Sequence, residues 1–333
     1  MKKIILTGGG SAGHVTPNLA LLPALRAAGF EAEYIGGIGI EKELAEKAGI
    51  PFHEIKTGRL RRDRLISRKN IHDAFSAVAG IGGAMSVINK TRPDIIFSKG
   101  GFVGLPVAIA GKLRGVPVVL HESDLTSGLA NRLSMPFASA ICCSFPETLE
   151  KLPEKKAFLT GNPIRPELLT GSARKGCQLC GFDNGRQGAV KPVMLAMGGS
   201  LGAHKINEAV TAALPTLLKT FNIIHITGHG KANPALSNQT GYAAFEFLDM
   251  DQGLADVFAA ASIVVSRAGS NAINEFLALR KPSLLIPLGK QASRGDQIQN
   301  ARSFAGQGFS MVLEEEALTP ESLIANIKEL YKN

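Results

Sequence analysis

Tryptophan is absent from this chain of 333 residues, and aromatic side chains make up only 6% of it. Proteins that bind single-stranded nucleic acid stack the bases on aromatic side chains, so this scarcity argues against that function. No run of eighteen apolar residues occurs either, and we therefore expect no membrane-spanning helix. Hydrophobic residues at 45% and charged residues at 20% are typical of a globular protein. The length alone predicts two domains.

Cysteine is also scarce, with four residues in the chain. Cys177 and Cys180 form a C-x-x-C pair, but the second pair that a structural zinc site needs is missing. The pair lies in a polar, glycine-rich stretch, which disfavours a thioredoxin-like redox motif. We interpret the cysteines as reduced thiols of a cytosolic protein, and we expect no metal ion and no cofactor. The sequence also lacks Walker A and H-E-x-x-H patterns, which argues against ATPase and zinc-protease functions.

Acidic residues are too few to balance the basic ones, and the net charge is +9. Residues 56–70 contain seven basic side chains and one acidic side chain, and an apolar stretch follows at residues 74–88. Basic residues beside an apolar face are typical of a protein that docks on an anionic membrane surface. We expect Arg61, Arg62 and Arg64 to make this contact. A solvated loop followed by a core helix is the alternative, and nucleic acid is disfavoured as a partner.

Short apolar runs alternate with helical patterns along the whole chain, which predicts β-α-β units with parallel sheets. The runs that predict strands are 3–7, 32–36, 94–98, 117–121, 139–143, 157–160, 192–197, 222–227, 245–248, 263–266, 283–287 and 310–313. The patterns that predict helices are 17–28, 103–114, 203–218, 271–279 and 296–305. Similar Gly-Gly-Ser turns follow the first strand and the strand at 192–197. This repetition predicts two Rossmann-like domains in tandem.

The first glycine turn, Gly8 to Gly13, fits the G-x-G-x-x-G pattern of a dinucleotide site. That function needs an acidic residue at the end of the second strand, where this chain has Gly36 and Gly37. The missing acid weakens an NAD-dependent dehydrogenase as an interpretation. His14 follows the turn at the edge of the sheet where open α/β folds bind ligands, and an imidazole there could act as a general base. A helix-capping histidine is the alternative.

Further polar loops follow strands at 99–102 and 121–124, on the same edge as His14, and together they favour a site there. In the second half, turns at 198–200 and 266–271 open helices and could hold a diphosphate with backbone N–H groups. Glu275 lies one turn into the second of these helices, where a carboxylate could accept hydrogen bonds from a ribose diol. A solvated helix residue is the alternative for Glu275.

Seven motifs then occur in a fixed order: GGGSAGHVTP, SKGGFVGLP, HESDLTSGLANR, TGNPIR, MGGSLGAHKIN, SRAGSNAINE and GDQIQNA. Together they resemble the MurG family, the bacterial N-acetylglucosaminyltransferases of peptidoglycan synthesis. The resemblance implies an α/β fold of the GT-B type, in which two Rossmann-like, doubly wound parallel-sheet domains face a cleft. It implies inverting transfer of N-acetylglucosamine from UDP-N-acetylglucosamine to the muramyl 4-hydroxyl of lipid I, a lipid-linked muramyl-peptide acceptor, giving lipid II. It also implies a peripheral protein at the cytoplasmic face of the cell membrane, with a role in cell-wall biogenesis, cell shape and cell division.

Turn residues cluster at Gly161-Asn162-Pro163, which predicts a division between the domains at about residue 162, and the resemblance implies a role for each side. Residues 1–162 would form the domain that faces the acceptor and the membrane, and residues 163–316 would form the domain that binds the UDP-sugar. The helix within 317–333 would pack back on the first domain.

Carried over by motif, the resemblance assigns roles to individual residues. His14 would stand near the reacting hydroxyl, and Glu122 is our second choice for the base. The residues implied in substrate binding are Ser11, Ala12, Gly13, Asp124, Arg165, Ser200, Leu248, Gly269, Ser270, Asn271, Ala272, Ile273, Asn274, Glu275, Asp296 and Gln297. Arg165 and Ser200 would face the diphosphate, the residues from 269 to 274 would wrap the phosphates, and Leu248 would border the uracil. Glu275 would hold the ribose, and Asp296 and Gln297 would meet the sugar.

Two departures from the family's motifs stand out. Ser11-Ala12 replaces Thr-Gly in the first turn, which keeps the hydroxyl and adds a methyl group. Ser123-Asp124 replaces Gln-Asn, which keeps an acceptor at Asp124 and loses an amide donor. Other functions that fit the pattern are a UDP-N-acetylglucosamine epimerase of the same fold, the dehydrogenase, and a sugar-nucleotide- or lipid-binding protein without catalysis.

Overall fold

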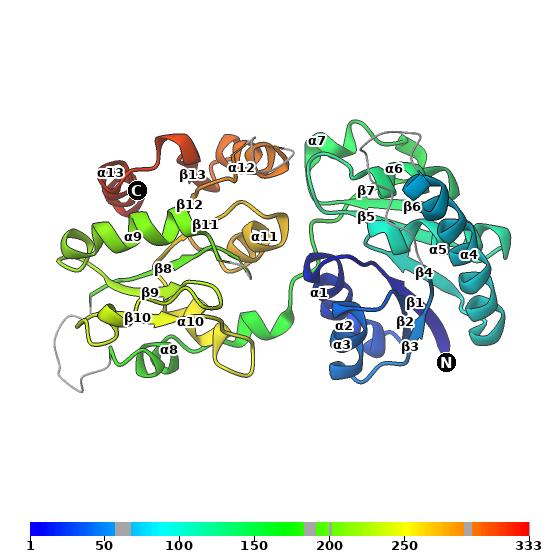
Figure 1. The fold of residues 1–333 in the computed structure, drawn as a ribbon, viewed down its shortest axis with the longest axis horizontal. Coiled ribbons are helices and arrows are strands. Elements are labelled where there is room, and N and C mark those ends of the chain that lie inside the picture. Colours follow the sequence, from blue (N-terminus) through cyan, green and yellow to red (C-terminus); the bar gives the residue numbers. More distant parts are fainter. Residues whose placement is uncertain (57–67, 183–190, 200–201, 290–294, 333) are drawn as a thin grey trace. The chain divides into compact units, whose positions relative to one another are not determined.

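The computed structural model describes residues 1–56, 68–182, 191–199, 202–289 and 295–332. The chain forms two compact units, residues 1–165 and residues 166–333 (Figure 1). Each unit is built around one sheet whose strand pairs are all parallel. Arg165 is the last residue of the first unit.

The first unit has a seven-stranded sheet. In spatial order its strands are β3 (Phe52–Glu54), β2 (Phe30–Gly36), β1 (Lys2–Thr7), β4 (Ile95–Ser98), β5 (Val118–Glu122), β6 (Ala140–Cys143) and β7 (Ala157–Leu159). Its helices are α1 (Ala12–Ala20), α2 (Leu22–Ala27), α3 (Ile40–Lys47), α4 (Arg68–Thr91), α5 (Gly101–Leu113), α6 (Leu129–Ser134) and α7 (Pro146–Leu149), with 3-10 turns η1 (Met135–Phe137) and η2 (Glu154–Lys156). The strand order reverses between β1 and β4, which is where such sheets bind ligands.

The second unit has a six-stranded sheet. Its strands lie in the order β10 (Tyr242–Phe245), β9 (Asn222–Ile226), β8 (Val193–Met197), β11 (Ile263–Ser266), β12 (Ser283–Leu285) and β13 (Ser310–Val312). Its helices are α8 (Ala173–Leu179), α9 (His204–Leu217), α10 (Leu254–Ala260), α11 (Ser270–Ala278), α12 (Asp296–Gly306) and α13 (Pro320–Lys332), with 3-10 turns η3 (Pro166–Thr170), η4 (Pro234–Leu236) and η5 (Glu315–Ala317). Here the order reverses between β8 and β11.

Strand β1 explains why the sheet of the first unit has a core on each face. Ile4 and Leu6 point to one face and pack in a cluster with Val15 of α1, while Ile5 points to the other face and packs in a cluster with Val103 of α5. Successive side chains of a strand point to opposite faces, so an uninterrupted apolar run buries both. This is why the apolar runs predicted the strands well.

The twelve predicted strands are all present, with small differences at their ends. The strand predicted at 245–248 lies earlier, at Tyr242–Phe245, because Tyr242 is the residue that pairs with Ile223 of β9. The three-residue edge strand β3 was not predicted, since its Phe-His-Glu sequence carries no apolar run. The helix predicted at 17–28 is two helices, α1 and α2, that meet at Leu21.

The apolar face of helix α13 belongs to the core of the second unit. Leu323, Ile327 and Leu330 share a cluster with Ile206 and Val210 of α9. These three side chains are spaced at four and three residues, so they form one stripe along the helix. The apolar stripe of this helix is therefore buried beside α9, and its packing on the first domain stays a prediction.

In the part of the chain that the structure describes, we find no helix with the length and apolarity needed to span a membrane. Arg61, Arg62 and Arg64 lie outside the described residues.

Candidate active site

Two glycine turns meet at the carboxyl edge of the first sheet. One turn joins β1 to α1, and the other joins β4 to α5. Gly101 has a φ of +75°, and a Cβ on it would collide with the carbonyl oxygen of Gly9. The two turns therefore touch through their backbones, which only glycine allows. This contact brings His14, in the first turn of α1, next to the end of β4.

His14 is oriented by a backbone hydrogen bond. Its Nδ1 lies 3.0 Å from the carbonyl oxygen of Lys99. A carbonyl oxygen can only accept, so Nδ1 carries the proton and Nε2 keeps its lone pair. Burial, followed by the positive charge of Lys99, lowers the pKa of His14, against an opposing effect of Asp124. The imidazole is therefore neutral at pH 7, with Nε2 able to accept a proton.

Glu122, the second choice for the base, is buried and held by three donors. Its carboxylate oxygens accept the backbone N–H groups of Asp124, at 3.1 Å, and Gly128, at 3.0 Å, and the side-chain amide of Asn131, at 2.9 Å. Burial raises the pKa of Glu122, and the hydrogen bonds oppose that shift. The contacts fix the loop that follows β5 and orient Asp124, and the role of Glu122 as an alternative base stays a prediction.

Glu41, which the sequence did not single out, occupies the glycine turn of the first unit. It is buried in the first turn of α3, and its Oε1 accepts the N–H of Gly10 at 2.8 Å. In a dinucleotide site, amides of this turn bind a phosphate. Here a carboxylate takes that place, which disfavours a dinucleotide. Gly10, Glu41 and Phe102 border a cavity of about 440 Å³.

The remaining candidates of the first unit lie near this edge. Ser11 is exposed and is the N-cap of α1, although its side chain makes no cap hydrogen bond. Ala12 and Gly13 begin α1 in front of His14. Asp124 is half-buried in the loop after β5. The structure therefore brings these four residues to the same edge of the sheet.

In the second unit, the N-terminus of α11 lies at the corresponding edge of the sheet, directly after β11. Ile273 donates its N–H to the carbonyl oxygen of Gly269 at 3.1 Å, and its side chain is in the core. Asn274 donates its side-chain amide to the carbonyl oxygen of Ser270 at 2.8 Å. These two contacts hold the turn together, and the phosphate contacts of residues 269–274 stay a prediction. Glu275 follows, half-buried, one turn into the helix.

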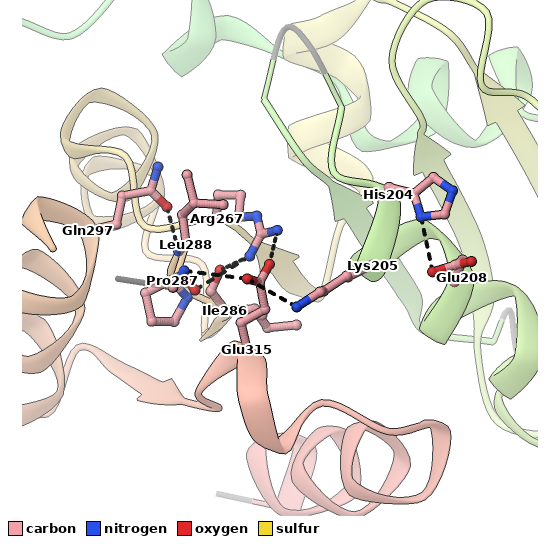
Figure 2. Close-up of polar contacts among 10 residues, drawn as sticks. His204, Lys205, Glu208, Arg267, Ile286, Pro287, Leu288, Gln297 and Glu315 are labelled. Atoms are coloured by element: carbon pink, nitrogen blue, oxygen red, sulfur yellow. Dashed lines mark hydrogen bonds and ion pairs between the residues drawn. The ribbon is translucent and has the colours of Figure 1, made fainter. Parts of the chain in front are cut away.

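Arg267 is a residue that the sequence analysis quoted within a motif but did not assign. It follows β11, and its guanidinium pairs with the carboxylate of Glu315 in η5. It also donates to the carbonyl oxygen of Ile286 at 3.1 Å. Figure 2 shows Glu315 between Arg267 and Lys205 of α9, whose ammonium lies 3.5 Å from it. The sequence signal that could have identified Arg267 is its position directly after the end of strand β11.

The other described residues predicted to bind the UDP-sugar lie in loops and at the start of a helix. Leu248 is buried in the loop after β10. Asp296 and Gln297 open α12, and Oε1 of Gln297 accepts the N–H of Leu288 at 3.0 Å (Figure 2). Arg165 lies at the end of the first unit. Ser200 lies outside the described residues. Among the described residues, we find no group of three or more His, Cys, Asp or Glu side chains that could hold a metal ion.

Both halves of the chain match domains of one enzyme family. The glycosyltransferase family 28 N-terminal domain matches residues 4–143, and the glycosyltransferase family 28 C-terminal domain matches residues 193–333. The crystal structure of Acinetobacter baumannii MurG is similar with a TM-score of 0.75 and 25% identity, over 99% of this chain and 91% of that one. A UDP-N-acetylglucosamine 2-epimerase structure from Listeria monocytogenes, 15% identical with a TM-score of 0.69, shares the fold. Fold and domains thus define a glycosyltransferase of family 28.

Curated relatives narrow this class. A Lachnospira eligens protein is 53% identical over 99% of this chain and 91% of its own length, and a Lachnoclostridium phytofermentans protein is 52% identical over 100% and 92%. Both are named UDP-N-acetylglucosamine--N-acetylmuramyl-(pentapeptide) pyrophosphoryl-undecaprenol N-acetylglucosamine transferase. The chain therefore belongs to the MurG family of N-acetylglucosaminyltransferases.

Proposed function

We propose that this protein transfers N-acetylglucosamine from UDP-N-acetylglucosamine to the 4-hydroxyl of the N-acetylmuramyl-pentapeptide carried on pyrophosphoryl-undecaprenol. The observation that carries the proposal is the identity of 50–53% with curated relatives of that activity along the whole chain. The two parallel sheets, each with glycine turns and helix N-termini at its carboxyl edge, agree with such a reaction.

The first unit supplies the base in this proposal. The acceptor oxygen attacks the anomeric carbon of the donor sugar while the bond from that carbon to the phosphate oxygen breaks. UDP leaves with the electron pair, and Nε2 of His14 takes the hydroxyl proton. A single displacement inverts the anomeric centre. The neutral state of His14, with its proton on Nδ1, is the state that this step requires.

The second unit supplies the donor site. The first N–H groups of α11 point out of its N-terminus and can bind the diphosphate, helped by the helix dipole. Glu275 lies far enough into the helix to accept hydrogen bonds from the ribose. Leu248, Asp296 and Gln297 are the proposed contacts to the uracil and the sugar, and Arg165 and Ser200 are the proposed partners of the diphosphate.

Docking on an anionic membrane surface completes the proposal, because the acceptor is linked to a lipid. The basic residues Arg61, Arg62 and Arg64 are the proposed contact, whereas Ala84 and Ile88 of the helix α4 that follows them are buried in the core of the first unit. Seven basic side chains at about 1 kcal/mol each near an anionic surface could hold the protein there without a spanning helix. The cytoplasmic face is the side on which UDP-sugars are found, and we place the protein there.

Release of UDP, measured with and without an acceptor, tests this function. UDP should appear from UDP-N-acetylglucosamine only with a lipid I analogue, and mass spectrometry should find the acceptor heavier by one N-acetylhexosamine. A thermal shift with UDP-N-acetylglucosamine and UDP, but not with NAD, is the expected binding result. UDP release without acceptor, together with an epimerised sugar, would support the epimerase instead. Stabilisation by NAD would support the dehydrogenase, and it would contradict the argument that the carboxylate of Glu41 at the Gly10 amide disfavours a dinucleotide.

A further inference from the structure

Lys99 lies at the end of β4, and its side chain is only 1% exposed. Among the described residues it is the one lysine or arginine whose side chain is buried to this degree. Removing an ammonium group from water costs several kcal/mol unless hydrogen-bond acceptors replace the water. The buried ammonium group of Lys99, beside the proposed base, therefore needs hydrogen-bond acceptors from the protein.

The ammonium group has an acceptor for each of its three N–H bonds. It lies 2.8 Å from Nδ1 of His121 and 2.8 Å from Oδ1 of Asn162, and it also donates to the hydroxyl of Ser123. These partners come from the end of β5, the loop after it, and the segment that leads out of the first unit. One side chain thus connects three parts of the chain at the same edge of the sheet.

The two histidines beside Lys99 are in opposite tautomers. Because the ammonium donates, Nδ1 of His121 must accept, and Nε2 of His121 carries its proton and donates to the carbonyl oxygen of Gly161 at 2.8 Å. Burial, followed by the charge of Lys99, lowers the pKa of His121 to about 3, so this ring is neutral. His14 has the reverse arrangement, with its proton on Nδ1 facing the backbone carbonyl of Lys99.

We propose that Lys99 is a positioning residue of the transfer reaction, which fixes opposite tautomers in His14 and His121. Its carbonyl oxygen leaves the lone pair of His14 on Nε2. Its ammonium group, through His121, Ser123 and Asn162, holds the loop after β5 and the segment 161–162 against the strand ends. The inference rests on the proposed function and adds to it a residue that does not itself touch the substrates.

The charges around this group determine the expected pH dependence. Lys99 and Asp124 face His14 from the ends of β4 and β5, and Glu41 faces it from α3. Burial lowers the pKa of Lys99 to about 7, while Glu122, Asp124 and Cys142 of β6 oppose that shift. Lys99 is therefore charged in the acidic range in which His14 titrates. Removal of this cation should raise the pKa of His14, and the base would then be protonated up to a higher pH.

The tautomers can be read directly from the wild-type protein by nitrogen NMR of labelled histidine, with His14→Gln and His121→Gln variants for assignment. We expect the proton on Nδ1 in His14 and on Nε2 in His121 at pH 6.5, where Lys99 is mostly charged. The reverse tautomer in either ring would overturn the proposal. This measurement needs neither substrate nor turnover, so it remains decisive if the proposed function fails or if a lysine variant does not fold.

Kinetics of Lys99→Met, which keeps an unbranched side chain one atom shorter and removes the charge, provide the second test. We expect kcat to fall by about 10- to 100-fold, the scale of a small misplacement of reacting groups. KM for the UDP-sugar should stay within about twofold of the wild-type value, since the donor site is in the other unit. The acid limb of the kcat/KM profile should move to higher pH. Lys112→Met, on the exposed face of α5, is the matched control and should change none of these values.

An acid limb that stays in place in Lys99→Met, with activity reduced in proportion to a loss of folded protein, would overturn the positioning role. Wild-type protein that transfers no sugar would instead contradict the proposed function, while the NMR result would stand by itself.

Discussion

The ion pair between Arg267 and Glu315 gives the sharpest stability prediction, through the substitution Glu315→Ala. Both side chains are nearly buried, at 11% and 8% exposed. Loss of the carboxylate leaves the guanidinium with two backbone acceptors, the carbonyl oxygens of Ile286, at 3.1 Å, and Pro287, at 3.4 Å. The variant therefore retains a buried cation with fewer partners.

Breaking a buried ion pair by removing one partner costs about 3–5 kcal/mol. The two carbonyl acceptors remain, so we expect the lower end, about 3 kcal/mol. For a unit of this size, each kcal/mol lowers Tm by about 2–4 °C, which predicts a decrease of about 6–12 °C in the transition of the second unit. Lys205 is 60% exposed, and its contact with the same carboxylate should contribute less than about 1 kcal/mol.

Scanning calorimetry of Glu315→Ala, with Lys205→Met as the control, measures this difference. The double variant Arg267→Met, Glu315→Leu should lose less stability than Glu315→Ala, since no unpaired charge stays buried. Burial alone would raise the pKa of Glu315, but the hydrogen bond and charge of Arg267 lower it overall. The stability that wild type has over Glu315→Gln should therefore be constant above about pH 5 and shrink as pH falls below about 4. A decrease no larger than that of Lys205→Met would refute the reasoning.

Three further predictions concern the proposed function. Glu275→Ala should weaken binding of UDP-N-acetylglucosamine by about 1.5–3 kcal/mol in calorimetry, because a charged acceptor for the ribose is lost, and unchanged affinity would make Glu275 a solvated helix residue. His14→Ala should lower kcat by about 100- to 10,000-fold with donor affinity nearly unchanged, and a variant that keeps most of its turnover would move the base elsewhere. Changing Arg61, Arg62 and Arg64 to Glu should abolish co-sedimentation with phosphatidylglycerol vesicles at low salt while UDP binding persists; equal binding of the wild type to neutral vesicles would contradict electrostatic docking.

The fold was largely predictable because parallel strands that are buried on both faces have uninterrupted apolar sequences. Ile263–Ser266 was predicted to the residue, and the turn after it was placed at the carboxyl edge of its sheet. The edge strand β3 was missed because three residues at an edge need no such run. The apolar stripe of helix α13 indicated burial but not the surface that buries it, which is the core around α9.

The site was predictable only as far as it depends on strand ends. The positions of His14 and the α11 turn follow from the topology of the sheets. The partners of Lys99 do not, since His121 is 22 residues away and Asn162 is 63 residues away. Glu315 is likewise 48 residues from Arg267. Contacts of this kind require the packed structure, because nothing in the local sequence marks the partner.

The position of α13 also has a consequence for the order of folding during synthesis. The first unit contains all its core residues once Arg165 has been made, and it can fold while the ribosome is still adding the second. The second unit cannot close in the same way, since Leu323, Ile327 and Leu330 complete the cluster around α9. Until they emerge, the part of this cluster that α13 covers stays exposed in the nascent chain. A chain that stops at Thr319 should therefore carry a folded first unit joined to an aggregation-prone second one.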